Sequence, residues 1–153
     1  MRTLNPAYVE AVKPIVNRSP YFTLISMEIG SLGWGESLLE VAVQEKHLQP
    51  FGMVHGGVYS SLVDAAAFWA VYPQILDDAG MTTVEMKLNF LAPSSGGRLI
   101  ARGRSLRVGK TLCLAEASVD DGKGLLLAHG LATMMILRDL KIHGQKDLPP
   151  KFI

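Results

Sequence analysis

The sequence VHGGVYSSLVDAAAFWA, residues 54 to 70, places a single acid, Asp64, in a run of apolar and small residues. Burying an ionised carboxylate without a partner is costly, because the charge loses its hydration and gains nothing in return. Asp64 is therefore either exposed to water or retained for a chemical role.

Two glycines, Gly56 and Gly57, come shortly before this acid. If a helix begins there, its first backbone N–H groups have no acceptor within the helix and lie at the positive end of the helix dipole. Glycines let a ligand oxygen approach such N–H groups closely, so the turn could stabilise an oxyanion. Asp64 shares a helix face with Gly57 but lies about 10 Å further along the axis. The acid and the glycines would meet only across two antiparallel helices of a dimer.

The segments around this helix predict the elements that must position it. Asn5 and Pro6 indicate an N-cap and the start of a short helix, while Pro14 argues against its second half. Ile25, Met27 and Ile29 alternate with polar residues, which predicts a strand. The turn GWGE and a second alternation at Leu39, Val41 and Val43 complete a hairpin.

Four further strands are predicted after the central helix. In TTVEMKLNFLAP, one face carries Val84, Met86, Leu88 and Phe90, and the other carries Thr83, Glu85, Lys87 and Asn89. Three more strands follow after short turns: RLIARGRSLRV, TLCLAEASVD and LLLAHGLATMMIL. The tail from Arg138 has no clear period, so we expect it to be irregular. The helix is apolar all round from Ala65 to Val71, so it needs cover on most sides. We therefore expect one α+β domain over residues 1–153, a curved antiparallel sheet wrapped around a central helix.

Composition excludes several classes of protein. The hydrophobic fraction is 48%, the charged fraction 19% and the net charge +1, which is typical of a globular protein without a nucleic-acid or membrane partner. The single Cys113 allows no internal disulfide, and no signal peptide or membrane span is evident. Four scattered histidines and one cysteine give no metal-ligand spacing. We expect a cytoplasmic protein that needs no metal and no other cofactor.

Three motifs together, HLQPFGMVHGGVYSSLVDAA, TTVEMKLNFLAP and RVGKTL, resemble the hotdog-fold acyl-CoA thioesterases of the PaaI type. The resemblance covers roughly Gly30 to Leu137. It implies an α+β hotdog fold and hydrolysis of an acyl-CoA, with a medium-chain, long-chain or aromatic acyl group, to the free acid and CoA. It also implies a homo-oligomer, either a dimer or a dimer of dimers.

The resemblance implies a role for each matching residue. Asp64 would act on the thioester as nucleophile or general base, and Gly56 would polarise the thioester carbonyl. His55 would support the loop, and Thr83 would help to position water. The segment expected to touch the coenzyme A moiety comprises Arg107, Val108, Gly109, Lys110, Thr111 and Leu112.

One position departs from the pattern of the family. Six residues before the histidine many members carry Asn, whereas this chain carries Gln49. A related branch that acts on aromatic acyl-CoA has Gln there but Glu as the helix acid, so this chain combines both patterns.

Other interpretations remain open for these residues. Asp64 could be a structural acid at an interface, and the arginines near Lys110 could form an ordinary solvated strand face. A non-catalytic acyl-CoA binding or sensing protein on the same fold is the main alternative function, and a hotdog hydratase is a weaker one.

Overall fold

The computed structural model describes residues 2–153. Its helices and strands, in chain order, are α1 (Pro6–Asn17), α2 (Pro20–Ile25), β1 (Met27–Gly33), β2 (Glu36–Ala42), α3 (Gly56–Val71), β3 (Ala79–Phe90), β4 (Arg98–Val108), β5 (Leu112–Asp120) and β6 (Leu126–Arg138), with short 3₁₀ turns at Glu45–His47, Tyr72–Gln74 and Gln145–Asp147. None of the described helices is long and apolar enough to cross a membrane.

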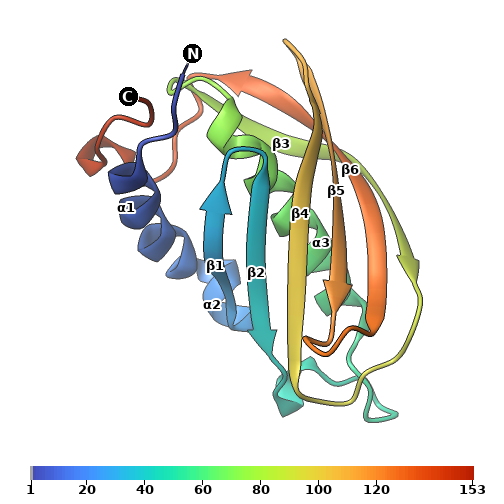
Figure 1. Cartoon of the computed structure of the whole chain (residues 1–153). Helices are drawn as coiled ribbons and strands as arrows, with labels where there is room; N and C mark the ends of the chain where they lie inside the picture. The colour runs from blue at the N-terminus through green and yellow to red at the C-terminus, as the bar shows by residue number, and fades with distance from the viewer. Residues whose placement is uncertain (1) are drawn as a thin grey trace.

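The six strands form one sheet in the order β1-β2-β4-β5-β6-β3, and every neighbouring pair is antiparallel. The sheet curves around α3, which packs against its inner face, while α1 and α2 lie beside the β1 edge (Figure 1). The expected α+β arrangement of a sheet wrapped around a central helix is confirmed. Strand β3 is one of the two sheet edges.

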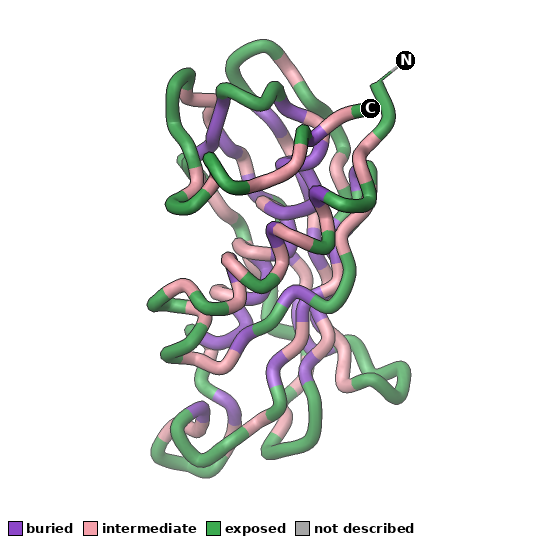
Figure 2. The backbone as a smooth tube through the Cα atoms, turned by 90° about the vertical axis from the view of Figure 1, so that its left-hand side faces the viewer, coloured by how far each residue is buried: buried purple, intermediate pink, exposed green. Residues whose placement is uncertain are grey.

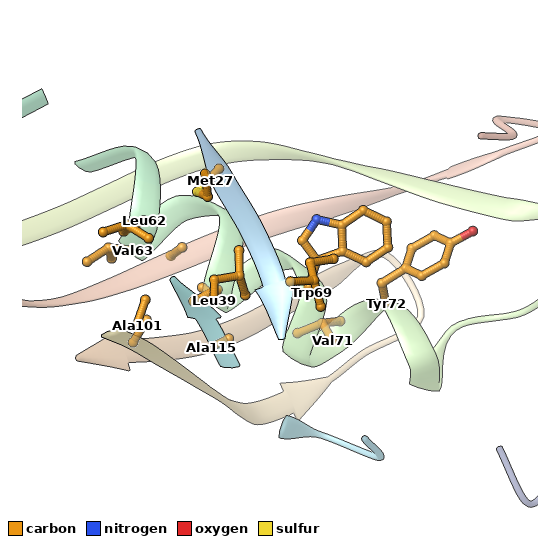
Figure 3. Close-up of a cluster of buried hydrophobic side chains, with 14 of the residues drawn as sticks. Met27, Leu39, Leu62, Val63, Trp69, Val71, Tyr72, Ala101 and Ala115 are labelled. Carbon is orange, nitrogen blue, oxygen red and sulfur yellow. The ribbon is translucent and has the colours of Figure 1, made fainter. Parts of the chain in front are cut away.

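The core lies between α3 and the inner face of the sheet. Figure 3 shows Leu62 and Val63 of α3 together with Leu39, Ala101 and Ala115 of the strands, all fully buried. The buried segments run through the middle of the molecule, and the exposed ones form its turns and ends (Figure 2). Small inward-facing residues let the helix come close to the sheet. At Gly103 a side chain would collide with the backbone carbonyl of Ala66, which already accepts a hydrogen bond from Ser37 Oγ at 2.6 Å.

The structure corrects two predictions about the N-terminal region. Helix α1 continues through Pro14 to Asn17, because its buried face of Tyr8, Val12 and Val16 packs on the core and offsets one lost backbone hydrogen bond. The predicted strand with Met27 and Ile29 is confirmed as β1, but its expected start at Ile25 is wrong, because residues 20–25 form α2. Pro20 occupies the first turn of that helix, and Ser26 ends it in the left-handed conformation with φ 54°.

A β-bulge corrects the predicted faces of β3. The pairing with β6 shifts register between Thr83 and Glu85, so one extra residue is accommodated there. The bulge moves Thr83 to the face that packs against α3, where Met86 and Leu88 also contact the core, and leaves Val84 52% exposed. The prediction that Thr83 and Met86 lie on opposite faces is therefore wrong.

The C-terminal tail is largely irregular, as predicted, but it contains a buried lysine. Lys151 is only 2% exposed, its Nζ donates to the carbonyl of Ile75 at 2.8 Å, and it lies 4.0 Å from the centre of the Tyr72 ring. The neighbouring Phe152 forms a β-bridge with Leu4, so the tail lies beside the N-terminal segment (Figure 1).

Candidate active site

The N-terminus of α3 leaves one backbone N–H free. His55 is the N-cap, and its Nδ1 accepts a hydrogen bond from the Gly57 N–H at 2.8 Å, while its carbonyl accepts from Val58 N at 2.9 Å. Because Nδ1 is an acceptor, the proton of the neutral His55 ring is on Nε2. The Gly56 N–H has no acceptor within residues 2–153. Of the two glycine N–H groups expected to bind an oxyanion, only that of Gly56 is therefore available to a ligand.

The turn before α3 is held by a histidine that the sequence did not single out. His47 is 2% exposed; its Nδ1 accepts from Gln44 N at 2.8 Å, and its Nε2 donates to the carbonyl of Ile25 at 2.7 Å. The backbone carbonyl of His47 accepts from His55 N at 2.8 Å. His47 therefore connects the end of α2, through its ring, to the residue that caps α3, through its backbone carbonyl. It lies in a short turn next to charged Glu45 and Lys46, with no apolar periodicity that could have indicated its burial.

Gln49 lies in the same loop and stabilises it. Its side-chain Oε1 accepts from the backbone N–H of Phe51, and its backbone N–H donates to Met53 O at 2.7 Å. Its side-chain Nε2 has no partner in the described part of the chain. Gln49 and Gly56 line the same cavity of ≈370 Å³, together with Tyr59 and Phe90. The structure therefore brings Gln49 and the free Gly56 N–H to one site.

Asp64 lies in the third turn of α3 and is held by a residue from β3. Thr83 Oγ1 donates to Asp64 Oδ1 at 2.6 Å, and the other carboxylate oxygen has no hydrogen-bond partner among the described residues. This contact depends on the bulge, since an unbroken strand alternation places Thr83 on the opposite face from Met86. Asp64 is partly exposed and borders a cavity of ≈360 Å³. One oxygen is thus oriented, and the second is available to a ligand or a water.

Within one chain, the cavity of Asp64 and the cavity of Gly56 are separate. The eight-residue interval along α3 corresponds to about 12 Å at the usual rise of about 1.5 Å per residue. The structure therefore brings Asp64 to Thr83 and Gly56 to Gln49, and it does not bring these two pairs together in a single chain.

The segment expected to contact coenzyme A forms the hairpin turn between β4 and β5. Gly109 N donates to Leu112 O at 3.0 Å, and a side chain at Gly109 would collide with that carbonyl. Val108, Gly109 and Lys110 border a third cavity of ≈380 Å³, which also contains Arg2 and Arg138. This cavity is distinct from those of Asp64 and Gly56 in the same chain.

The other arginines near this turn belong to a paired strand face. Arg98, Arg102 and Arg104 form ion pairs with Glu40, Asp120 and Glu116, respectively. The hydrogen bond from Arg104 lowers the pKa of Glu116 below its usual value. Of the expected basic cluster, only Arg107 and Lys110 have no carboxylate partner within residues 2–153.

Two further residues do not join the site. Cys113 is buried, and this burial raises the pKa of its thiol, which keeps it in the unreactive form. His129 pairs with Glu116 at 3.1 Å on the outer face of the sheet. Residues 2–153 contain no group of three or more His, Cys, Asp or Glu that could hold a metal ion.

Comparison with known proteins identifies the family to which the chain belongs. Residues 51–128, which include the α3 turn, Asp64 and Thr83, match the model of the thioesterase superfamily. The chain belongs to the thioesterase superfamily. A 1,4-dihydroxy-2-naphthoyl-CoA hydrolase from Listeria monocytogenes is 30% identical over 117 residues, covering 76% of this chain and 95% of the relative. Acyl-coenzyme A thioesterase 13 from Mus musculus is 29% identical over 98 residues, covering 63% and 69%.

The fold is shared with solved members of the superfamily. A thioesterase from Haemophilus influenzae superposes with a TM-score of 0.82 at 19% identity, covering 94% of this chain and 99% of that one. The hotdog fold expected from the sequence is thereby confirmed. As a superfamily member, the chain has relatives that hydrolyse thioesters, and this supports hydrolase activity.

Proposed function

We propose that this thioesterase-superfamily protein hydrolyses the thioester of an acyl-CoA to the free acid and CoA. The observation that carries the proposal is the Asp64 carboxylate, which has one oxygen fixed by Thr83 at 2.6 Å and the other free beside an apolar cavity. The two relatives named for reactions of CoA esters support the same substrate class.

The reaction can proceed by two routes from this geometry. As a general base, Asp64 takes a proton from water while the water oxygen attacks the thioester carbonyl. As a nucleophile, Asp64 attacks the carbonyl itself, expels the CoA thiolate and forms an anhydride that water then cleaves. In both routes negative charge develops on the carbonyl oxygen, which the free N–H of Gly56 is suited to stabilise.

The proposed reaction needs a second copy of the chain. Because Asp64 and Gly56 border separate cavities, we propose at least a dimer in which Asp64 approaches the partner subunit's Gly56. Strand β3 offers a free edge for such an assembly, and Val84 and Phe90 on it are 52% and 58% exposed. Sedimentation at micromolar concentration tests this proposal, and a fully active monomer would contradict it.

Substitution of Asp64 tests the proposed activity. Asp64→Asn keeps the shape and can still accept the Thr83 hydrogen bond, but it is neither a nucleophile nor a base. We expect thiol release from the best acyl-CoA to fall at least about a hundredfold while the melting temperature is kept. Near wild-type turnover in the folded variant would refute the mechanism. No turnover by the wild type on any acyl-CoA, with binding retained, would support a binding protein instead.

Isotopic labelling tests the nucleophilic route. In a single turnover in ¹⁸O-labelled water, with enzyme in excess, water that cleaves the anhydride at the Asp64 carbonyl places the label on Asp64, and a labelled Asp64 identifies this residue as the nucleophile. Mass spectrometry of the peptide that contains Asp64 reads the result.

A further inference from the structure

Helix α2 forms a wall of the cavity that contains Asp64. Tyr21 and Phe22 of this helix line the cavity together with Phe68 and Trp69 of α3, Met27 of β1 and Met86 of β3. The lining is therefore mainly aromatic and sulfur-containing, and such surfaces pack well against a flat ring. At ≈360 Å³ the cavity is near the lower end of the usual range for ligand pockets, about 300–1,000 Å³, which favours a compact group over a long chain.

One hydrogen bond fixes the position of Tyr21 over this cavity. The Tyr21 hydroxyl lies 2.6 Å from Ser61 Oγ, one helical turn before Asp64. Ser61 Oγ donates its only proton to the carbonyl of Gly57 at 2.8 Å, so Tyr21 must be the donor to Ser61. Tyr21 is thus hydrogen-bonded to α3, the helix that carries Asp64, although α2 itself has no fully buried residue.

The remainder of α2 is held from its other end. Its last carbonyl, Ile25 O, accepts the hydrogen bond from His47 Nε2, and Ser26 Oγ accepts from Lys46 Nζ at 2.6 Å. The wall is therefore fixed at both ends, by Ser61 near the acid and by the buried His47.

We propose that Tyr21 is a specificity-determining residue whose ring, held by the hydrogen bond to Ser61, forms one wall of a pocket for an aromatic acyl group. This inference rests on the proposed function, because it assumes that Asp64 acts on the carbonyl attached to that ring. An aromatic acyl group would pack against Tyr21, Phe22 and Phe68 of the lining, with its carbonyl next to the free oxygen of Asp64.

The test compares benzoyl-CoA with decanoyl-CoA as substrates of the full-length protein. The wild type should have the higher kcat/KM for benzoyl-CoA. Tyr21→Ala should lower kcat/KM for benzoyl-CoA at least about tenfold and change the value for decanoyl-CoA little, because only the ring contact is lost. Leu24→Ala is the matched control: it lies on the same helix, is 66% exposed and does not border the cavity, so it should leave the ratio unchanged.

A double-mutant cycle tests the role of the hydrogen bond. Tyr21→Phe keeps the ring, and Ser61→Ala removes the acceptor, so each should reduce the preference for benzoyl-CoA, and the double variant should reduce it no further than the stronger single one. Additive effects would overturn the proposed role of this hydrogen bond.

The outcomes separate this inference from the proposed function. If the wild type hydrolyses decanoyl-CoA better than benzoyl-CoA, or if Tyr21→Ala lowers both equally, the aromatic pocket is wrong and the thioesterase proposal is unaffected. If Asp64→Asn turns over as fast as the wild type, the proposed function fails first.

Discussion

We expect the protein to become more stable as the pH rises from 7 to 9, because Lys151 is buried as an amine. Burial lowers the pKa of Lys151 from 10.5 to about 7, and the charge of Asp77 only partly opposes this effect. Tyr72, whose ring lies against the Lys151 ammonium group, and Tyr8, which is hydrogen-bonded to Tyr72, have pKa values raised by burial, so both stay neutral over this range.

The sign and size of the effect follow from proton linkage. Between pH 7 and 9 the unfolded chain keeps the Lys151 proton and the folded chain has largely lost it, so unfolding takes up a proton and becomes harder as pH rises. The cost of burying the ammonium is fully present below pH 7 and disappears above pH 10.5. The full difference corresponds to about 5 kcal/mol at about 1.36 kcal/mol per pH unit. The rise from pH 7 to 9 alone is about 2 kcal/mol.

Urea unfolding at pH 6, 7, 8 and 9 measures this dependence. Lys151→Met keeps the length of the side chain without its charge, so its free energy of unfolding should lack the rise attributed to Lys151. Lys146→Met, at an exposed position of the same tail, controls for the loss of a lysine charge. Parallel pH curves for the wild type and Lys151→Met would refute this reasoning.

Further predictions concern the loop and the turn around the site. Gln49→Glu keeps the oxygen that accepts from Phe51 N but removes Nε2, so we expect a lower kcat at an unchanged melting temperature, whereas Gln49→Ala should lower both. His47→Phe leaves Gln44 N and Ile25 O without partners, and urea unfolding should show a loss of about 2–4 kcal/mol. Lys110→Ala and Arg107→Ala should raise KM for an acyl-CoA and leave kcat unchanged. Neither variant should affect the hydrolysis of a short thioester that lacks the nucleotide. Equal effects on both substrates would show that the turn does not recognise coenzyme A.

The sequence was most informative where a pattern and its chemistry agreed. The two glycines before a long apolar run predicted both the helix start at Gly56 and its burial, because glycine, capping and periodicity all indicate the same element. The hydrogen-bond acceptors of the N–H groups at this helix start could not be predicted in the same way. His55 accepts the hydrogen bond of the Gly57 N–H and so leaves Gly56 as the free donor. This contact depends on the side-chain rotamer of His55, which no sequence pattern encodes.

The wrong predictions arose where the alternation of apolar and polar residues was too short, or was shifted by a bulge. The alternation of Ile25, Met27 and Ile29 correctly indicated β1, but it cannot fix where a strand begins, and Ile25 instead ends the helix that starts at Pro20. The bulge near Thr83 exchanges the two faces of a strand without changing its composition, so alternation alone assigned this residue to the wrong side. Lys151 has the sequence context of an exposed tail, and only the docking of that tail buries it.

The strand order also has a consequence for folding kinetics. Strands β4, β5 and β6 are consecutive and pair through short turns, whereas β2 reaches β4 only across the whole segment 43–97, and β3 must pair with β6 at the far edge. Closing long loops costs entropy before their contacts are gained, so we expect the meander of β4 to β6 to form first and β3 to join late. The contact between Thr83 and Asp64 belongs to that late step. Contacts absent from the transition state govern the unfolding rate, so Thr83→Val should speed unfolding in a stopped-flow chevron and leave the refolding rate nearly unchanged.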